Sequence, residues 1–399
     1  MVFRRLKSII FFLIALLLLS SGVIVVDRVK FDIEHSFPVD EIFPCPEEIV
    51  AQVKFWEKIF SRYNSSQVLI HDAWELDRIY EVVDFINLYP DKKLSNYVKW
   101  RTVLQIKNHY VDELLFLDQH PDGYPERVLS PIQARLKKIL ENDKSPYKYR
   151  RAAENVRIQF GLSDRFKNGI ETLGKYRPYM VEIFNRYELP LELLAIPLYE
   201  SSFVLRALSF VNAAGVWQFM PGTARLYMRV NDYVDERYDP LIATEAAAKL
   251  LTYNYKHSGS WPLAITSYNH GLMGMIWAKQ DLGTNDIGKI IRYYKSPTFG
   301  FASRNFYPEF VAAKHCLNEM YNLYNNIQFA PTWEFITVEL SRPRTLANIS
   351  SITGVPVKEL YEYNPSFRTA IINSIAPLWR GYQLRLPNYL KDQKNKINL

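Results

Sequence analysis

Glycine, histidine and cysteine are scarce in this chain of 399 residues, and the first two scarcities exclude whole classes of protein. The 15 glycines form neither a Walker loop nor a dinucleotide-binding fingerprint. The seven histidines are dispersed and form no zinc-protease motif or ligand cluster, so no metal and no other cofactor is expected. No long run of lysine or arginine is present, which argues against nucleic acid as a partner.

The abundant residues describe a globular, weakly basic protein rich in aromatic side chains. Hydrophobic residues make up 48% of the chain, and the length allows two or three domains with cores of their own. The net charge of +7 is scattered, which suits an anionic polymer such as a cell wall. The aromatic content of 15% favours a sugar-binding cleft, although ordinary cores use aromatic residues too. The two cysteines, Cys45 and Cys316, allow one disulfide, and the sequence does not show whether they pair.

Residues 1–26 have the pattern of an export signal. Basic residues precede an apolar run from Ile9 to Leu19, and small residues up to Gly22 permit cleavage there. Because apolar residues resume over 23–26, a retained membrane anchor is a second open interpretation. No cysteine lies in or just after the run, so a lipoprotein anchor is not expected. Both interpretations place the bulk of the protein in the periplasm or cell envelope, with inner-membrane attachment only through this segment.

The rest of the chain divides into a linker, two helical regions and a small mixed unit, so the predicted fold class is mainly α. Residues 27–46 predict a proline-containing linker, 47–155 a helical region of unknown role, and 156–325 a compact helical domain. Residues 332–388 predict a βααβ unit that begins with an alternating strand and ends with a strand over Tyr382–Leu386. Within the compact domain we expect helices at Lys167–Tyr187, Pro190–Ser201, Pro221–Val230, Pro240–His257, Trp261–Trp277 and Phe306–Tyr324.

A basic segment over Tyr147–Lys175 leads into the compact domain. The simple interpretation is a solvated surface helix, and the alternative is a contact with anionic glycan or peptide. Its basic residues include Arg150, Arg151, Arg157, Arg165 and Lys167.

The most informative stretch of the chain is 189–220. It opens with an apolar run, Leu189–Leu198, that only Glu192 interrupts, and Glu200 follows just past that run. A helix that is apolar nearly all round is buried, so Glu200 lies where a buried helix reaches the edge of a core. Burial raises the pKa of a carboxyl, and a carboxyl that is neutral near pH 7 is what a general acid requires. The alternative is an ordinary surface glutamate at a helix end.

The first of three polar motifs after Glu200 is GVWQFMP at 215–221. Gly215 allows a close backbone approach, Gln218 offers a donor and an acceptor, and Met220 offers a flexible apolar surface. Such a set suits an N-acetyl sugar, whose amide needs polar partners and whose methyl group needs apolar cover. A buried turn with a core methionine is the alternative.

Two more motifs follow in the next ninety residues. The polar pair Tyr268 and Asn269 lies inside an otherwise apolar helical pattern, where it needs hydrogen-bond partners. A functional cleft and a satisfied core network both explain that pair. Tyr307 lies in the motif RNFYPE, for which an ordinary helix start is the alternative.

The order of these motifs carries a resemblance. Glu-Ser, Gly-x-x-Gln-x-Met-Pro, Tyr-Asn-x-Gly and Asn-x-Tyr together resemble the lysozyme-like catalytic domain of bacterial lytic transglycosylases, of the membrane-bound murein transglycosylase D type, over about Val156 to Tyr324. The C-terminal unit resembles LysM, a peptidoglycan-binding domain. Asn364-Pro365 fits that pattern, whereas Arg342-Pro343-Arg344-Thr345-Leu346 stands where Gly-Asp-Thr-Leu is expected.

The resemblance implies a peptidoglycan lytic transglycosylase with glycan strands as its partner. Glu200 would be the sole catalytic acid and base, and the neighbouring serine would orient it or the N-acetyl group. The D type is described as a lipoprotein, from which this chain departs because it has no well-placed cysteine. The residues that the resemblance assigns to substrate binding are Ser201, Gln218, Met220, Tyr268, Asn269 and Tyr307.

The sequence offers no clear second catalytic carboxylate, although most glycosidases use two. Asp239 precedes a helix-initiating proline, and the others after Glu200 are interpreted as surface charges, namely Asp232, Asp235, Glu236 and Glu309. One carboxylate suffices if the C6 hydroxyl of N-acetylmuramic acid attacks its own C1 and forms a 1,6-anhydro ring. The alternatives that stay open are a lysozyme-type hydrolase and a non-catalytic cell-wall-binding protein.

Overall fold

The computed structural model describes residues 40–90, 94–120, 128–397 and 399. The predicted signal or anchor segment and most of the predicted linker lie outside these residues. Buried hydrophobic side chains form three separate clusters, which we call the main core, the sheet core and the C-terminal core. Within the described ranges, no helix combines the length and the apolar character that crossing a membrane requires.

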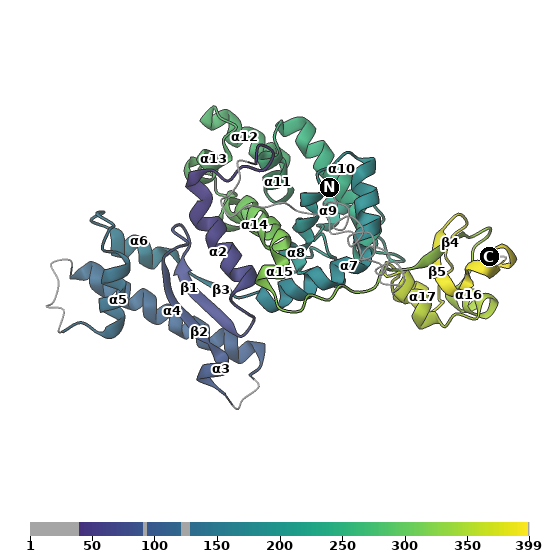
Figure 1. Ribbon diagram of the computed structural model, residues 1–399, viewed down its shortest axis with the longest axis horizontal. Helices are drawn as coiled ribbons and strands as arrows, with labels where there is room; N and C mark the ends of the chain where they lie inside the picture. Colours follow the sequence, from purple (N-terminus) through teal and green to yellow (C-terminus); the bar gives the residue numbers. More distant parts are fainter. Residues whose placement is uncertain (1–39, 91–93, 121–127, 398) are drawn as a thin grey trace, which may run out of the picture. The chain divides into compact units, whose positions relative to one another are not determined.

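The main core is built by helices that are far apart in the sequence, from α2 to α14 (Figure 1). Helix α14 lies at its centre and packs on α2, α11 and α8. Helix α2 carries Trp56, whose indole Nε1 donates to Oδ1 of Asn305 on α14 (3.0 Å). Phe43, at the end of the predicted linker, packs its ring on Phe310 with the centroids 5.0 Å apart. The main core therefore takes in residues 43–61, which the sequence assigned to the linker and to the region before residue 156. Its helices are α2 (Val50–Ser61), α7 (Ser163–Arg186), α8 (Ile196–Ser201), α10 (Pro240–Ser258), α11 (Trp261–His270) and α14 (Phe301–Asn318).

Proline correctly predicted the starts of α10 and α11. A glycine explains why one predicted helix is divided into two. The predicted helix Trp261–Trp277 is divided at Gly271, whose φ of 86° is left-handed, so that α12 (Leu272–Leu282) runs separately. The predicted helix from Pro221 is only α9 (Pro221–Ala224), and α14 begins five residues before the predicted Phe306. The remaining helices of this part are α13 (Ile287–Tyr293), which the sequence did not predict, and α15 (Met320–Leu323).

The region 47–155, predicted to be helical, contributes most of a mixed α/β layer. Strand β1 pairs antiparallel with both β2 and β3, so the sheet order is β2-β1-β3. Val68 and Ile70 of β1 pack in the sheet core with Tyr110 and Leu114 of α4. Short apolar runs do not distinguish a strand from a buried helix, which is why these strands were missed. The layer consists of β1 (Gln67–Asp72), β2 (Ile79–Asp84), β3 (Val156–Phe160), α3 (Phe85–Leu88), α4 (Asn96–Gln119), α5 (Pro131–Ile139) and α6 (Lys148–Asn155).

The C-terminal unit has the predicted βααβ order. Strand β4 pairs antiparallel with β5, and Gly354 ends the first helix between them with a φ of 74°. The structure adds a short helix before β5 and a 3₁₀ segment after it. The elements are β4 (Phe335–Glu339), α16 (Leu346–Thr353), α17 (Val357–Tyr363), α18 (Thr369–Ile372), β5 (Gln383–Pro387) and the segment Asn388–Lys396.

The loop before α10 holds this unit through buried charges. Asp235 is 1% exposed and pairs with Arg237 and with Arg368 (both 2.9 Å). Asp239 accepts from the backbone N–H groups that begin α10, as its place before Pro240 predicts, and also pairs with Arg385. The interpretation as surface charges is therefore wrong for Asp235 and for Glu236, which is also buried. Arg368 and Arg385 are distant in sequence, and no local pattern reveals their pairing with Asp235 and Asp239.

Candidate active site

Glu200 lies in the last turn of α8, directly above the main core. Leu198 is fully buried, and Ser202 ends the helix in the left-handed region with a φ of 50°. Phe203 follows with a φ of 53° and is also buried. Two consecutive non-glycine residues in this region are rare and strained, so the surrounding packing must hold them there. The turn ends the helix sharply and leaves the Glu200 side chain half-buried at the surface of the core.

Burial controls the protonation of Glu200. Loss of hydration raises the pKa of its carboxyl from the ordinary 4.5 to about 8. The group is therefore mostly protonated at neutral pH. A protonated carboxyl at the edge of a core can donate a proton to a bound ligand, as the sequence predicted.

The predicted GVWQFMP motif forms a tight loop around Gly215. This glycine has a φ of 75°, and a Cβ added to it would lie 1.7 Å from the carbonyl oxygen of Arg237. Gln218 is itself left-handed, with a φ of 48°, and its Nε2 donates to the Gly215 carbonyl oxygen (2.8 Å). Met220 is 44% exposed. The loop thus combines a rigid backbone with one amide and one accessible methionine.

Two hydroxyl groups attach this loop to its neighbours. The Ser201 hydroxyl donates to the Val216 carbonyl oxygen (2.9 Å), and the Tyr268 hydroxyl donates to the Trp217 carbonyl oxygen (2.8 Å). Successive carbonyl groups of the loop are therefore bonded to α8 and to α11. Ser201 acts on the position of the loop relative to Glu200, because its hydroxyl is directed to backbone oxygens.

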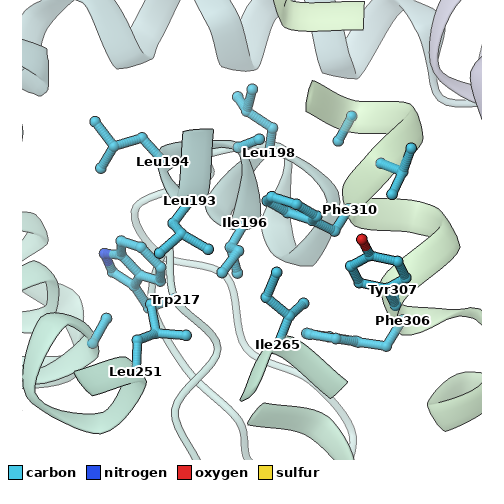
Figure 2. Close-up of a cluster of buried hydrophobic side chains, with 14 of the residues drawn as sticks. Leu193, Leu194, Ile196, Leu198, Trp217, Leu251, Ile265, Phe306, Tyr307 and Phe310 are labelled. Atoms are coloured by element: carbon cyan, nitrogen blue, oxygen red, sulfur yellow. The ribbon is translucent and has the colours of Figure 1, made fainter. Parts of the chain in front are cut away.

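The remaining predicted residues separate into one at the surface and one in the core. Asn269 is exposed, and its Oδ1 accepts from the Ser303 hydroxyl (2.9 Å). Tyr307 is fully buried, and its hydroxyl donates to the Pro44 carbonyl oxygen (2.8 Å). Figure 2 shows Tyr307 among the apolar side chains of the main core. The structure therefore does not bring Tyr307 to the surface of the site.

The structure adds two residues that the sequence did not assign to the site, Tyr199 and Glu309. The Tyr199 hydroxyl is buried and makes no hydrogen bond with any described residue. Glu309 is half-buried on α14, and burial together with the neighbouring Glu200 raises the pKa of Glu309 well above its usual range. The interpretation of Glu309 as a surface charge is therefore wrong. The sequence signal for Glu309 was its position three residues after Phe306, because residues at this spacing lie on the same face of a helix. The Phe306 ring contacts both Tyr199 and Tyr268.

The described part of the chain contains no group of three or more histidine, cysteine, aspartate and glutamate side chains that could hold a metal ion. Cys45 and Cys316 are both free thiols. A pocket of about 550 Å³ lies elsewhere, between residues 41–46 and the start of α11, and none of the predicted site residues lines it.

Two segments of the chain match known protein families. The family of the transglycosylase SLT domain matches residues 181–290, a segment that contains Glu200, the GVWQFMP loop and Tyr268. The chain therefore carries an SLT domain. A second match, to the LysM-like domain of lytic transglycosylase MltD, covers residues 334–396. The predicted relationship to the D type of lytic transglycosylase and the predicted fold class, mainly α with a lysozyme-like helical domain and a LysM-like unit, are thereby confirmed.

Individual relatives agree with these matches. The chain is 27% identical over 209 residues to membrane-bound lytic murein transglycosylase D of Escherichia coli strain K12, which covers 50% of this chain and 45% of that protein. It is 35% identical over 98 residues to a tributyltin chloride resistance protein of Alteromonas sp. strain M-1, which covers 24% of this chain and 47% of that protein. The chain thus spans less than half the length of both relatives. The solved 70 kDa soluble lytic transglycosylase of Escherichia coli covers 56% of this chain and 37% of its own, with 19% identity and a TM-score of 0.30.

Proposed function

We propose that this protein is a peptidoglycan lytic transglycosylase, which cleaves the β-1,4 bond between N-acetylmuramic acid and N-acetylglucosamine and leaves a 1,6-anhydro-muramic acid end. The observation that carries the proposal is the position of Glu200 beside the GVWQFMP loop, half-buried so that its pKa is raised, inside a segment that matches the SLT domain. The D-type relative supports the same substrate.

In this mechanism one carboxyl serves first as acid and then as base. Glu200 donates its proton to the glycosidic oxygen, and the acetamido oxygen of the substrate stabilises the oxocarbenium-like carbon. The ionised Glu200 then takes the proton of the C6 hydroxyl while the C6 oxygen bonds to C1. The glycosidic bond breaks, one C–O bond forms within the same sugar, and no water is consumed.

Glu309 bears on the choice between this reaction and hydrolysis. A hydrolase needs a second, ionised carboxylate as base or nucleophile. Burial and the adjacent Glu200 raise the pKa of Glu309 well above its usual range, although Arg157 opposes the shift, so the ionised form that hydrolysis needs is disfavoured at Glu309. A neutral Glu309 favours the intramolecular attack over the lysozyme-type alternative.

We assign the glycan contacts to the predicted site residues whose side chains are not enclosed in the main core. Gln218 and Met220 line the cleft, and Asn269 holds the sugar. Tyr268 holds the loop through the Trp217 carbonyl group, and Ser201 does the same through the Val216 carbonyl group.

We further propose that the protein acts in the cell envelope, exported by the segment 1–26 and either released into the periplasm or anchored by that segment. The relative named above is membrane-bound, which supports an envelope location. The LysM-like unit would add a second glycan contact.

The decisive experiment analyses the products released from purified peptidoglycan by mass spectrometry. We expect 1,6-anhydro muropeptides from the wild type and a loss of at least a thousandfold for Glu200→Gln, with unchanged binding to the polymer. Glu192→Gln, eight residues before Glu200 in the 3₁₀ turn Leu191–Ala195 that precedes α8, is the matched control and should retain activity. Reducing ends as the main product would establish the hydrolase, and binding without any release would establish the non-catalytic alternative.

A further inference from the structure

Several cations of the basic segment 147–175 form ion pairs, and Arg157 forms none within the described part of the chain. Arg150 pairs with Asp118, and Lys167 pairs with Glu171 (both 2.8 Å). Arg151 likewise pairs with Asp143. Arg157, on β3, is exposed and makes no ion pair or hydrogen bond with any side chain that the structure describes.

Arg157 instead lies over an aromatic ring, and a second arginine beside it does the same. The Arg157 guanidinium carbon is 3.8 Å from the centroid of Phe301, and that of Arg304 is 3.3 Å from the centroid of Trp74. The buried Nε of Arg304 has no hydrogen-bond partner among the described residues. Burial, with the repulsion of Arg157, lowers the pKa of Arg304 to about 10. Both side chains nevertheless remain cationic at neutral pH, and neither has a counter-ion in an ion pair.

The two guanidinium groups lie beside the candidate active site. Ser303, the residue before Arg304, donates to Asn269 (2.9 Å). Glu309, five residues after Arg304 on α14, interacts electrostatically with both Arg157 and Glu200. The first three turns of α14 therefore connect the arginine pair to the catalytic carboxyl.

We propose that Arg157 and Arg304 form an anion site that binds a carboxylate of the peptide stem of peptidoglycan next to the bond that is cleaved. This proposal rests on the proposed function and names a part of its substrate. The sugars of the glycan strand are uncharged, and the lactyl carboxyl of N-acetylmuramic acid is consumed in the amide bond to the stem. Free carboxylates are therefore a property of the stem peptide.

The geometry suits this ligand. A guanidinium group binds a carboxylate through two parallel hydrogen bonds, and an aromatic face beneath it fixes its plane before the ligand arrives. Two unpaired cations close together repel each other, and a bound anion relieves that repulsion. The site also gives a role to the layer of residues 64–160, because Arg157 and Trp74 both belong to it.

The test compares soluble glycan strands with native stems to the same strands after the stem carboxylates have been converted to amides. We expect amidation to lower kcat/KM of the wild type by about tenfold or more, as the loss of charge-assisted hydrogen bonds predicts. Arg157→Gln and Arg304→Gln should show the same loss on native stems and no further loss on amidated stems. Arg157→Lys should recover part of the rate.

Arg165→Gln is the matched control, because Arg165 is an exposed arginine of the same basic segment, on α7. It should behave as the wild type on both substrates. A wild type indifferent to amidation, or arginine variants that lose equal activity on both substrates, would overturn the anion site. If Arg304→Gln fails to fold, the exposed Arg157 carries the test.

Binding separates this inference from the proposed reaction. In the Glu200→Gln protein, calorimetry with the same two substrates should show about a tenfold weaker Kd for amidated strands. Absence of anhydro products from the wild type together with this difference in Kd would refute the reaction and retain the anion site. Equal Kd values would refute the anion site alone.

Discussion

Replacing Glu200 with glutamine should stabilise the protein by an amount that depends on pH. The folded protein holds the pKa of this carboxyl at about 8, against 4.5 for an ordinary glutamate. Below pH 4.5 the carboxyl is protonated in both states and contributes no penalty. As the pH rises from 4.5 to 8, the unfolded chain releases the proton and the folded protein retains it. Folded stability therefore falls throughout that window, because the unfolded state gains a favourable ionisation that the folded state lacks.

The size of the effect follows from the pKa difference. One pKa unit corresponds to about 1.4 kcal/mol, so the Glu200 carboxyl should cost about 1 kcal/mol of stability at pH 5 and about 3 kcal/mol at pH 7. Glutamine has nearly the same shape and no titration. The stability advantage of Glu200→Gln over the wild type should therefore grow by about 2 kcal/mol from pH 5 to pH 7.

Urea unfolding at the two pH values, followed by tryptophan fluorescence, measures this growth. Glu182→Gln, a change at an exposed glutamate of α7, is the control and should give the same small difference at both pH values. A Glu200→Gln advantage that does not change between pH 5 and pH 7 would refute the argument that burial keeps the acid protonated.

Three further predictions concern the surroundings of Glu200. Glu309→Gln should retain activity within a few-fold, because the native carboxyl is already neutral, whereas a hundredfold loss in kcat would show that an ionised Glu309 takes part. Gly215→Ala should destabilise the protein by about 2 to 4 kcal/mol in thermal unfolding, since the new Cβ would collide with the Arg237 carbonyl oxygen and the residue is left-handed. Tyr268→Phe removes the hydrogen bond to the Trp217 carbonyl oxygen and should lower the free energy of unfolding by about 1 kcal/mol. It should also lower kcat, and an unchanged kcat would show that this hydrogen bond does not position the loop.

The environment of Glu200 could be predicted because its cause is local. The apolar run from Leu189 to Leu198 is visible in the sequence, and the structure buries it as a 3₁₀ turn, Leu191–Ala195, followed by α8. The close approach at Gly215 was also visible, since only glycine tolerates it. The βααβ unit was predicted to within a residue or two, because its strands alternate and Gly354 ends its first helix.

The errors at the candidate site arise from the way the helices pack. Glu309 faces Glu200 only because α14 packs on α8, which a pattern within either helix does not show. Tyr307 follows Phe306 in the same helix, and consecutive helical residues point roughly 100° apart. Because the Phe306 ring faces Tyr268 with the centroids 6.1 Å apart, the tyrosine after it is turned into the main core, toward Pro44.

The site extends well beyond the segment that matches the SLT domain. Helix α14 begins after residue 290, yet it supplies Phe306, which packs on Tyr268, and Glu309, which interacts with Glu200. That helix is held in turn by α2, through the hydrogen bond from Trp56 to Asn305. The raised pKa of Glu200 depends on burial, and this burial requires the packing of α14 against α8. The raised pKa is therefore a property of the main core as a whole, and we expect a fragment of residues 181–290, which lacks α14, to hold the Glu200 carboxyl at a lower pKa.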